Sequence, residues 1–316
     1  MDEPVTTTNL SIRFSALALV VLVAAVAHGQ PPPDPLAQAR SLAKSGQLAK
    51  SEEALQSYLK ANPSSAEAHF LLGYVLFREK RAKESLAEFT AGAALQHPGA
   101  EDLKVVASDY VMLGDYGDAD KWYTQVVVAR PDDADAWYLL GRTKFNESNF
   151  AAAASCFQRA LTLRPRYVQA EDNLGLARQE SNQTDEAKAA FQMAIDWQGD
   201  KPGDAQPFLN MGTLLASEND VSQALPYLER AVQLAPDNPK IHEQLAQVYA
   251  AQQNLPKAQG ELEAAVALAP SISGLHFKLG QIYRKEGLRE RAEKEFQICA
   301  RLNSTHSSPQ TPNPPR

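Results

Sequence analysis

Two stretches of the sequence carry residue types that could bind a metal ion. Residues 242–246 (HEQLA) begin like the helical zinc-protease motif, in which two histidines on one helix face bind the ion and a glutamate acts as the base. Ala246 replaces the second histidine, so this pattern predicts no zinc site. Residues 115–120 (DYGDAD) are acidic, but they lack the ligand order, the glycine and the distant glutamate of a calcium loop. We therefore expect no metal and no other cofactor.

The sequence also lacks the short motifs of common catalytic sites. It contains no phosphate-binding loop, nucleophile elbow or dinucleotide fingerprint. The formal net charge is -7 and no block of Lys and Arg stands out, which argues against binding to nucleic acid. Hydrophobic residues make up 44% of the chain, enough for a continuous core. These observations predict a folded protein that is not an enzyme.

Residues 134–167 are the clearest copy of a unit that recurs along most of the chain. When this unit is numbered from 1 to 34, position 4 holds Trp137, position 8 Gly141, position 24 Phe157 and position 32 Pro165. Positions 4, 7, 8 and 11 form one stripe of a first helix, and positions 17, 20, 24 and 27 form one stripe of a second. Proline at position 32 ends the second helix, because it lacks an amide donor. Each unit is therefore a pair of helices.

These residue types at these spacings resemble the tetratricopeptide repeat. The resemblance implies an all-α fold, a right-handed superhelical solenoid of antiparallel helix pairs. We expect the small residues at position 8 to let two backbones approach closely, and the large residues at positions 4, 7 and 24 to fill the gaps between helices. The solenoid is predicted over residues 36–306, in the repeats 32–65, 66–99, 100–133, 134–167, 168–204, 205–238, 239–272 and 273–306.

The repeat also explains three of the six histidines and both thiols. His69, His242 and His276 all occupy position 4, the place of Trp137 in the clearest copy, so we expect each to be a wedge between helices rather than a ligand. Cys156 and Cys299 lie in repeats that are not neighbours, and each repeat of a solenoid contacts only the next. We expect both to be packing residues.

One insertion interrupts the regular spacing. The repeat 168–204 is three residues longer than the others, and residues 198–204 (QGDKPGD) replace its final proline with turn-forming residues. This stretch is either a hinge between two halves of the array or a surface loop.

The two ends of the chain differ from the repeats. Residues 1–29 contain the apolar run 14–27, which favours a cleaved signal peptide; the alternative is an uncleaved membrane anchor. Residues 30–35 form a proline-rich linker, and residues 307–316 form a tail that we expect to be disordered. The leader predicts an exported protein, periplasmic or secreted, or one anchored in a membrane and facing the extracytoplasmic side.

The resemblance also implies where a partner binds. In tetratricopeptide repeats the first helices line a concave surface, and positions 2, 5, 9, 12 and 13 point into it. In the first half of the array these positions give an aromatic groove with three basic residues. The predicted groove residues are Phe70, Tyr74, Phe77, Arg78, Lys104, Met112, Tyr138, Arg142, Phe145 and Asn146.

The function that follows is a non-catalytic adaptor or assembly scaffold outside the cytoplasm, with a protein or peptide ligand in the groove. The alternative is a regulatory or targeting subunit of an envelope-associated enzyme complex. Some family members clamp the terminal carboxylate of chaperones with Lys and Asn side chains, but here Lys104 is followed by Ser108, and Leu139 replaces the next Asn. A cytosolic chaperone adaptor is therefore disfavoured.

Overall fold

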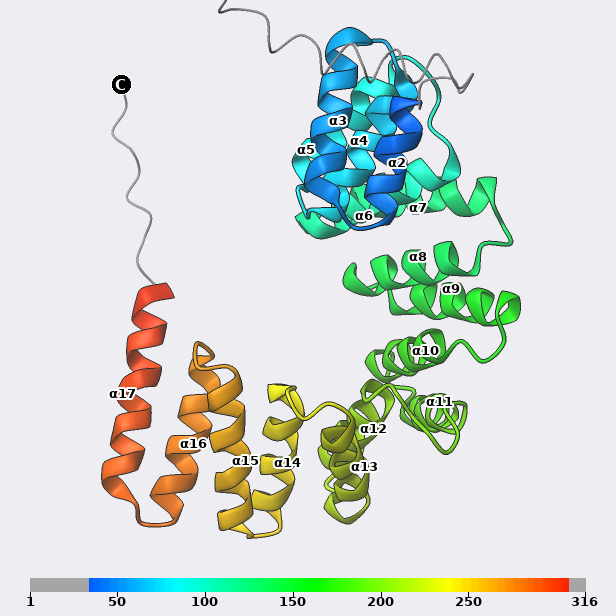
Figure 1. The fold of residues 1–316 in the computed structure, drawn as a ribbon. Helices are drawn as coiled ribbons and strands as arrows, with labels where there is room; N and C mark the ends of the chain where they lie inside the picture. The colour runs from blue at the N-terminus through cyan, green and yellow to red at the C-terminus, as the bar shows by residue number, and fades with distance from the viewer. Residues whose placement is uncertain (1–33, 307–316) are drawn as a thin grey trace, which may run out of the picture. The chain divides into compact units, whose positions relative to one another are not determined.

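The structure, a computed structural model, describes residues 34–306, and every regular element in that range is an α-helix (Figure 1). The predicted leader (1–29) and tail (307–316) lie outside the described residues, as does most of the predicted linker. Pro35, the last residue of that linker, is the first residue of a helix. The Asp34 carboxylate accepts a hydrogen bond from the Leu36 amide at 3.0 Å, which caps this helix.

The described helices form antiparallel pairs in tandem, as the repeat predicts, and within each of the two units described below helices that follow one another in the chain pack together. The first helices of the pairs are α2 (Pro35–Lys44), α4 (Ala66–Arg78), α6 (Ala100–Leu113), α8 (Ala134–Asn146), α10 (Val168–Glu180), α12 (Gln206–Ser217), α14 (Pro239–Ala251) and α16 (Ser273–Lys285). The second helices are α3 (Leu48–Ala61), α5 (Ala82–Ala93), α7 (Tyr116–Ala129), α9 (Phe150–Leu163), α11 (Thr184–Asp196), α13 (Val221–Leu234), α15 (Leu255–Leu268) and α17 (Arg289–His306).

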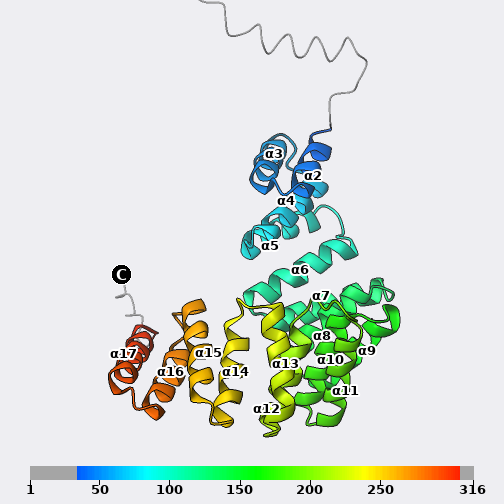
Figure 2. The same ribbon diagram turned by 60° about the horizontal axis from the view of Figure 1, so that its bottom comes forward.

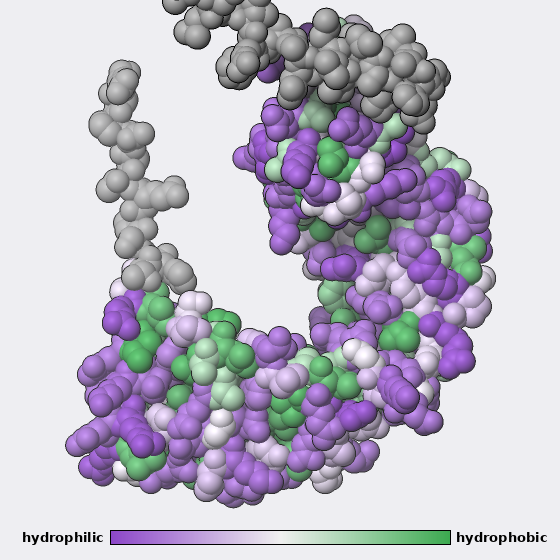
Figure 3. Space-filling model, viewed as in Figure 1, coloured by the Kyte–Doolittle hydropathy of each residue, from purple (hydrophilic) through white to green (hydrophobic). Residues whose placement is uncertain are grey.

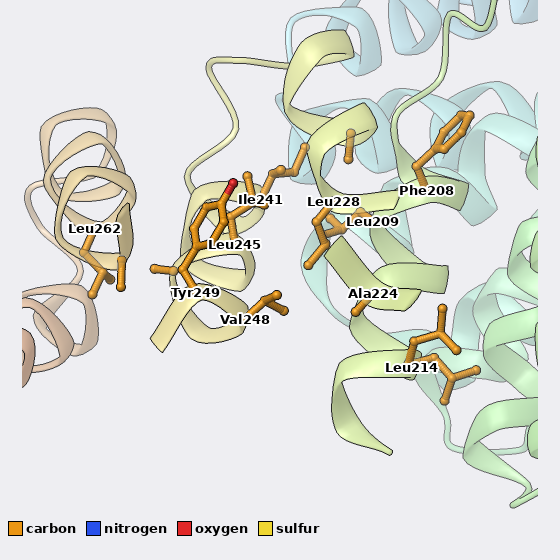
Figure 4. Packing of buried hydrophobic residues seen from close by; sticks show 14 of the residues in the cluster. Phe208, Leu209, Leu214, Ala224, Leu228, Ile241, Leu245, Val248, Tyr249 and Leu262 are labelled. Atoms are coloured by element: carbon orange, nitrogen blue, oxygen red, sulfur yellow. The ribbon is translucent and has the colours of Figure 1, made fainter. Parts of the chain in front are cut away.

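The chain divides into two compact units, an N-terminal unit that ends at Asp115 and a C-terminal unit that begins at Tyr116. The division falls inside the third repeat rather than at the 198–204 insertion. In the C-terminal unit, one apolar cluster continues across that insertion and includes Phe191 before it and Phe208 after it. Figure 4 shows the part of this cluster around Phe208, and Figure 2 shows helices α14 to α17 side by side. The continuous core favours the surface-loop interpretation of the insertion over the hinge.

The turn inside each pair has the same conformation in all eight repeats of the described chain. Position 15 is left-handed in every one, with φ between 59° and 80°. Glycine adopts this conformation at the least cost, and it occupies position 15 in three repeats, at Gly46, Gly114 and Gly287. Lys, Ser, Asn or Gln occupies it in the other five, so the fold imposes this turn even where the local residue disfavours it.

Within a repeat, the glycine at position 8 of the first helix faces the large residue at position 24 of the second. A Cβ atom added to Gly141 would lie 2.6 Å from Phe157 Cε1, and one added to Gly175 would lie 2.5 Å from Phe191 Cε1. Phe157 and Phe191 are both fully buried. The small residue at position 8 thus makes room for an aromatic ring, which is more specific than the close backbone approach that we expected.

Substitution of Gly141 by Ala tests this contact. The added methyl group cannot be accommodated without moving the buried Phe157 ring, so we expect the free energy of unfolding to fall by about 1–3 kcal/mol. Exposed Gly260 in α15 is the matched control, because a Cβ atom there meets nothing within 4 Å. Gly260→Ala should raise the free energy of unfolding by about 0.5–1 kcal/mol, through the better helix propensity of Ala.

Urea unfolding of both variants, followed by circular dichroism, gives the comparison. Adding Phe157→Leu to Gly141→Ala creates the pairing that Ala246 and Leu262 have in a later repeat, and it should recover part of the lost stability. Equal stability changes in the Gly141 and Gly260 variants would contradict the proposed role of position 8.

The residue at position 4 ties its helix to the turn that precedes the repeat. Trp137 Nε1 donates a hydrogen bond to the carbonyl oxygen of Pro131 at 3.0 Å. Where position 4 is histidine, Nε2 makes the same contact with the preceding proline, at 3.1 Å for His69, 2.8 Å for His242 and 3.0 Å for His276. These side chains are therefore wedges at the junctions between repeats, as predicted.

Candidate functional site

The residues of the metal-like motif at 242–246 are engaged in packing between helices. His242 Nδ1 lies 2.6 Å from a carboxylate oxygen of Glu261 on the neighbouring helix α15. Glu243 pairs instead with Lys240, at 2.9 Å, and with Lys278 of α16. Burial acts to raise the pKa of Glu243, but the hydrogen bonds and charges of these two lysines lower it on balance. Within residues 34–306 there is no group of three His, Cys, Asp or Glu side chains that could hold a metal ion.

The other reactive side chains also have structural partners. Asp118 pairs with Lys121 at 2.7 Å, and Asp120 pairs with Lys144 of α8 at 2.7 Å. Cys156 is buried, and this burial raises the pKa of its thiol to about 11, so the thiol stays protonated near neutral pH. The acidic stretch therefore forms ion pairs, and Cys156 is a packing residue, as the repeat pattern predicted for this cysteine.

The N-terminal unit contains a groove of about 600 Å³ among its first helices. Phe70 and Tyr74 of α4 line it, together with Val105 of α6. Arg40 of α2 forms an ion pair with Glu67 of α4 at the same groove. The complete lining is Arg40, Glu67, Phe70, Leu71, Tyr74, Gln96, His97, Gly99, Glu101, Asp102 and Val105. Apart from the segment 96–99, every lining residue belongs to a first helix, which is the arrangement that the groove prediction requires.

The predicted groove residues of this unit differ in how much of their surface they offer. Phe70 and Tyr74 are half-buried, and Arg78 Nη1 donates a hydrogen bond to the Tyr74 hydroxyl at 3.0 Å. Phe77 is half-buried and Met112 is exposed, but neither lines the groove. The last predicted residue here, Lys104, is half-buried and pairs with Glu101 at 3.4 Å. Phe70 and Tyr74 are therefore the predicted residues of this unit that line the groove.

Several groove residues were not predicted from the sequence. Arg40 occupies groove position 9 of the first repeat. This repeat matches the common pattern poorly, so the pattern gave no groove residues for it. Gln96 and His97 lie between repeats, where the helix pattern makes no prediction. Asp102 accepts a hydrogen bond from the Gly99 amide at 2.9 Å, and burial raises the pKa of its carboxyl group. These residues make the groove more polar than its aromatic residues suggest.

The other four predicted residues lie in the C-terminal unit, on helix α8. The Arg142 guanidinium lies 5.9 Å from the Tyr138 ring centroid, and Asn173 of α10 approaches the Tyr138 hydroxyl at 3.5 Å. Phe145 packs edge-on against Phe150, with 5.2 Å between the two ring centroids. It also packs against the buried cluster of α9 and α10, so it helps to hold these helices together. Arg142 and Asn146 are exposed. That all ten predicted residues line one continuous groove remains a prediction, since they divide between the two units.

A buried polar network lies beside Tyr138, between α10 and α12. Asp172 is only 3% exposed, and Asn210 Nδ2 donates to both of its carboxylate oxygens, at 2.9 and 3.0 Å. Gln206 in turn donates to Asn210 Oδ1 at 2.8 Å. Burial raises the pKa of Asp172 to about 7; the Asn210 hydrogen bond opposes this rise and the Asp204 charge adds to it. Asp172 is at groove position 5, but its carboxyl group is held inside the repeat stack.

A second buried carboxyl group occurs in the N-terminal unit. Asp109 is fully buried, and its carboxyl group lies 2.5 Å from the Ser85 hydroxyl, which is also 2.8 Å from the Gly73 carbonyl. The single hydroxyl hydrogen of Ser85 cannot bond to both the Gly73 carbonyl and the Asp109 carboxyl group. Both contacts are satisfied when Ser85 donates to Gly73 and a protonated Asp109 donates to the Ser85 oxygen. Burial raises the pKa of Asp109 to about 7, which favours this arrangement.

The raised pKa of Asp172 predicts a pH dependence of stability. The native state holds this proton up to about pH 7, whereas an unfolded aspartate releases it near pH ~4. The stabilisation that protonation gives is fully present below pH ~4 and is lost as the pH rises through about 7. We expect Asp172→Asn, which cannot ionise, to become more stable than the wild type by about 1–3 kcal/mol above that pH.

Urea unfolding across this pH range, read as the difference between variant and wild type, checks the prediction. Asp109 is present in both proteins, so its contribution to the free energy of unfolding cancels when the variant and the wild type are compared. Asp200→Asn, at an exposed position of the same unit, controls for the loss of one negative charge without burial. A difference between Asp172→Asn and wild type that does not change with pH would contradict the assignment.

Matches to protein families cover the helical part of the chain. Residues 36–100, 215–272 and 273–306 each match the tetratricopeptide repeat family. Residues 103–220 match the middle TPR-like domain of cilia- and flagella-associated protein 70.

Curated relatives share this part of the chain but are much longer proteins. A match to protein O-mannosyl-transferase TMTC1 of Homo sapiens is 26% identical over 208 residues, which is 64% of this chain and 23% of that protein. Protein FlbA of Caulobacter vibrioides is 29% identical over 133 residues, 42% of this chain and 22% of that protein. The chain therefore spans less than a quarter of the length of each of these two relatives.

Solved structures confirm the fold. A tetratricopeptide repeat protein from Parabacteroides merdae superimposes with a TM-score of 0.63 at 17% identity, covering 84% of this chain and 97% of that one. Yeast Tom70 gives a TM-score of 0.62 at 16% identity, covering 81% of this chain and 55% of that one. At these identities the likeness shows the arrangement of helix pairs and nothing about the ligand. Among residues 34–306, no helix is long and apolar enough to span a membrane.

Proposed function

Because the chain is a tetratricopeptide repeat protein, we propose that it is a non-catalytic adaptor or assembly scaffold that binds a segment of a partner protein. Tetratricopeptide repeats are protein-interaction modules, so binding of a protein or peptide follows from the family. The groove as the binding site, the absence of catalysis and a location outside the cytoplasm are our proposals. The mannosyl-transferase activity in the name of one relative is not extended to this chain, which spans 23% of that protein.

The groove of the N-terminal unit is the observation that carries the proposal. Its volume of about 600 Å³ lies in the range of sites that hold a few side chains of a ligand. Phe70 and Tyr74 offer aromatic surface there, while the Arg40–Glu67 ion pair adds polar groups at the same place. Aromatic anchors with polar groups around them are typical of the energetic centres of protein interfaces.

The partners of the reactive side chains support a non-catalytic role. His242 and His276 bind a glutamate and a carbonyl oxygen, and the Cys156 thiol is buried and protonated. Export is supported by the apolar run 14–27 of the sequence, which has the length of a signal-peptide core. If this run is instead retained as an anchor, the repeats face the extracytoplasmic side of a membrane.

Removal of one groove side chain tests the site. Tyr74→Ala deletes an accessible aromatic group of the groove, so we expect recovery of the partner in affinity capture from the envelope or secreted fraction to fall about tenfold. Arg142→Ala tests the predicted surface of α8 in the same way. Arg159→Ala is its matched control, because Arg159 is also an exposed arginine and lies on the second helix of the same repeat.

Mass spectrometry of the captured proteins gives the readout, and circular dichroism confirms that each variant is folded. Unchanged recovery with both Tyr74→Ala and Arg142→Ala would show that the partner does not use these surfaces. Recovery of an active enzyme with the wild-type chain would favour the alternative role, a regulatory or targeting subunit.

A further inference from the structure

The 198–204 insertion forms one wall of a second pocket, in the C-terminal unit. This pocket has a volume of about 850 Å³ and lies where three connections between repeats meet: the turn after α9, the insertion after α11 and the turn after α13. The residues that line it are Arg164, Arg166, Tyr167, Val168, Gln169, Gln198, Lys201, Gly203, Asp204, Ala205, Gln206, Leu234, Ala235 and Asn238. The extra residues of this repeat thus create a surface that the regular repeat does not provide.

The Gln198 side chain holds the insertion in a defined shape. Its Oε1 accepts hydrogen bonds from the amides of Gly203 at 3.1 Å and Asp204 at 2.8 Å, and its Nε2 donates to the Asp204 carbonyl at 3.2 Å. Arg166 links the opposite wall to this one, because its Nη2 donates to the Trp197 carbonyl at 3.3 Å. These bonds close the insertion, which contains Lys201, upon itself.

The charges around this pocket are mostly positive. Arg164 is already neutralised, since it forms two hydrogen bonds of 2.7 Å with the Asp135 carboxylate. Arg166 and Lys201 are exposed, and neither forms an ion pair within residues 34–306. The whole chain has a net charge of -7, whereas this pocket contains two cations that form no ion pair with the described residues. The pocket therefore differs in charge from the chain as a whole.

One carboxylate opposes these cations. Asp204 also lines the pocket, but its Oδ1 accepts a hydrogen bond from the Gln206 amide at 2.9 Å, in the first turn of α12. The positive N-terminal end of α12 therefore compensates part of the negative charge of the Asp204 carboxylate. No side chain caps α10, which begins at the same pocket, so the positive end of that helix adds to the local field.

Apolar groups complete the lining. Val168, Ala205, Leu234 and Ala235 are each half-buried, so part of their surface is free to contact a ligand.

We propose that this pocket binds an acidic segment of a partner protein. Asp or Glu carboxylates of the segment would pair with Arg166 and Lys201, and an apolar side chain would lie beside Val168 and Leu234. Charge complementarity on an otherwise acidic chain selects this ligand, because longer polyanions are repelled by the rest of the surface. The inference rests on the proposed function for the existence of a protein partner.

Binding of a labelled synthetic peptide in which Leu alternates with Asp tests the inference with the purified chain. Arg166→Asn and Lys201→Gln each remove one cation, and Asn tolerates the left-handed backbone of Arg166, whose φ is 64°. We expect each variant to weaken binding about fivefold, and added salt to weaken binding to the wild type. Asp204→Asn should strengthen binding, because it removes the opposing charge.

Lys285→Gln is the matched control, since Lys285 is an exposed lysine of the same unit outside the pocket. A peptide with Asn in place of Asp should bind at least tenfold more weakly. Equal binding of the two peptides, or equal losses in the Lys201 and Lys285 variants, would overturn the inference. Self-association of the chain that disappears in the Arg166 and Lys201 variants would assign the pocket to a second copy instead. These measurements do not involve Tyr74, so either proposal can fail while the other stands.

Discussion

The packing of position 24 against position 8 is the contact on which each repeat depends. In five repeats a glycine at position 8 faces a Phe or Leu side chain so closely that any Cβ atom would collide with it. In the repeats 32–65 and 239–272 position 8 is alanine, at Ala39 and Ala246, and position 24 is Leu55 or Leu262; all four residues are buried. These side chains must fit one another closely, because neither a void nor an overlap is tolerated in a close-packed interior.

A second recurring contact joins one repeat to the next and engages the side chain at position 4. The ring N–H at position 4 binds the carbonyl oxygen of the preceding proline, whether the ring belongs to Trp137 or to a histidine. When the ring is histidine, its other nitrogen binds a glutamate on the second helix of the same repeat, as in His276 and Glu295 at 2.6 Å. The histidine at position 4 and its glutamate therefore hold the two helices of a repeat together. Hydrophilic residues cover most of the visible surface of α14 to α17 (Figure 3).

The features that could be predicted from the sequence are those set by spacing within one repeat. The helix pairs, the small residue at position 8 and the wedge at position 4 follow from periodicity, because residues three or four apart on a helix share a face. The burial of Asp172 could not be predicted in this way, since it depends on Asn210 in the next repeat. The same holds for Arg40, whose partner Glu67 is also in the next repeat. Contacts between repeats are formed by residues that the pattern leaves free, so a pattern of one repeat contains no information about them. Among the predicted groove residues, Tyr74 lines a groove, and Phe145 packs against Phe150 of its own repeat.

All repeats pack in the same way. A residue that departs from the common pattern at a cost to stability is therefore a good candidate for a functional role. Asp172 places a carboxyl group in the interior where an apolar residue would pack without penalty, and its Asn210 hydrogen bonds only partly offset that cost. Arg166 adopts a left-handed conformation that a glycine or asparagine would adopt more easily, and this places its guanidinium beside the insertion. The two departures lie close together, because Asp204 of the insertion lines the pocket and also acts on the pKa of Asp172. Gln206 also lines the pocket and donates to Asn210, so the surface that we assign to a partner adjoins the buried network between α10 and α12.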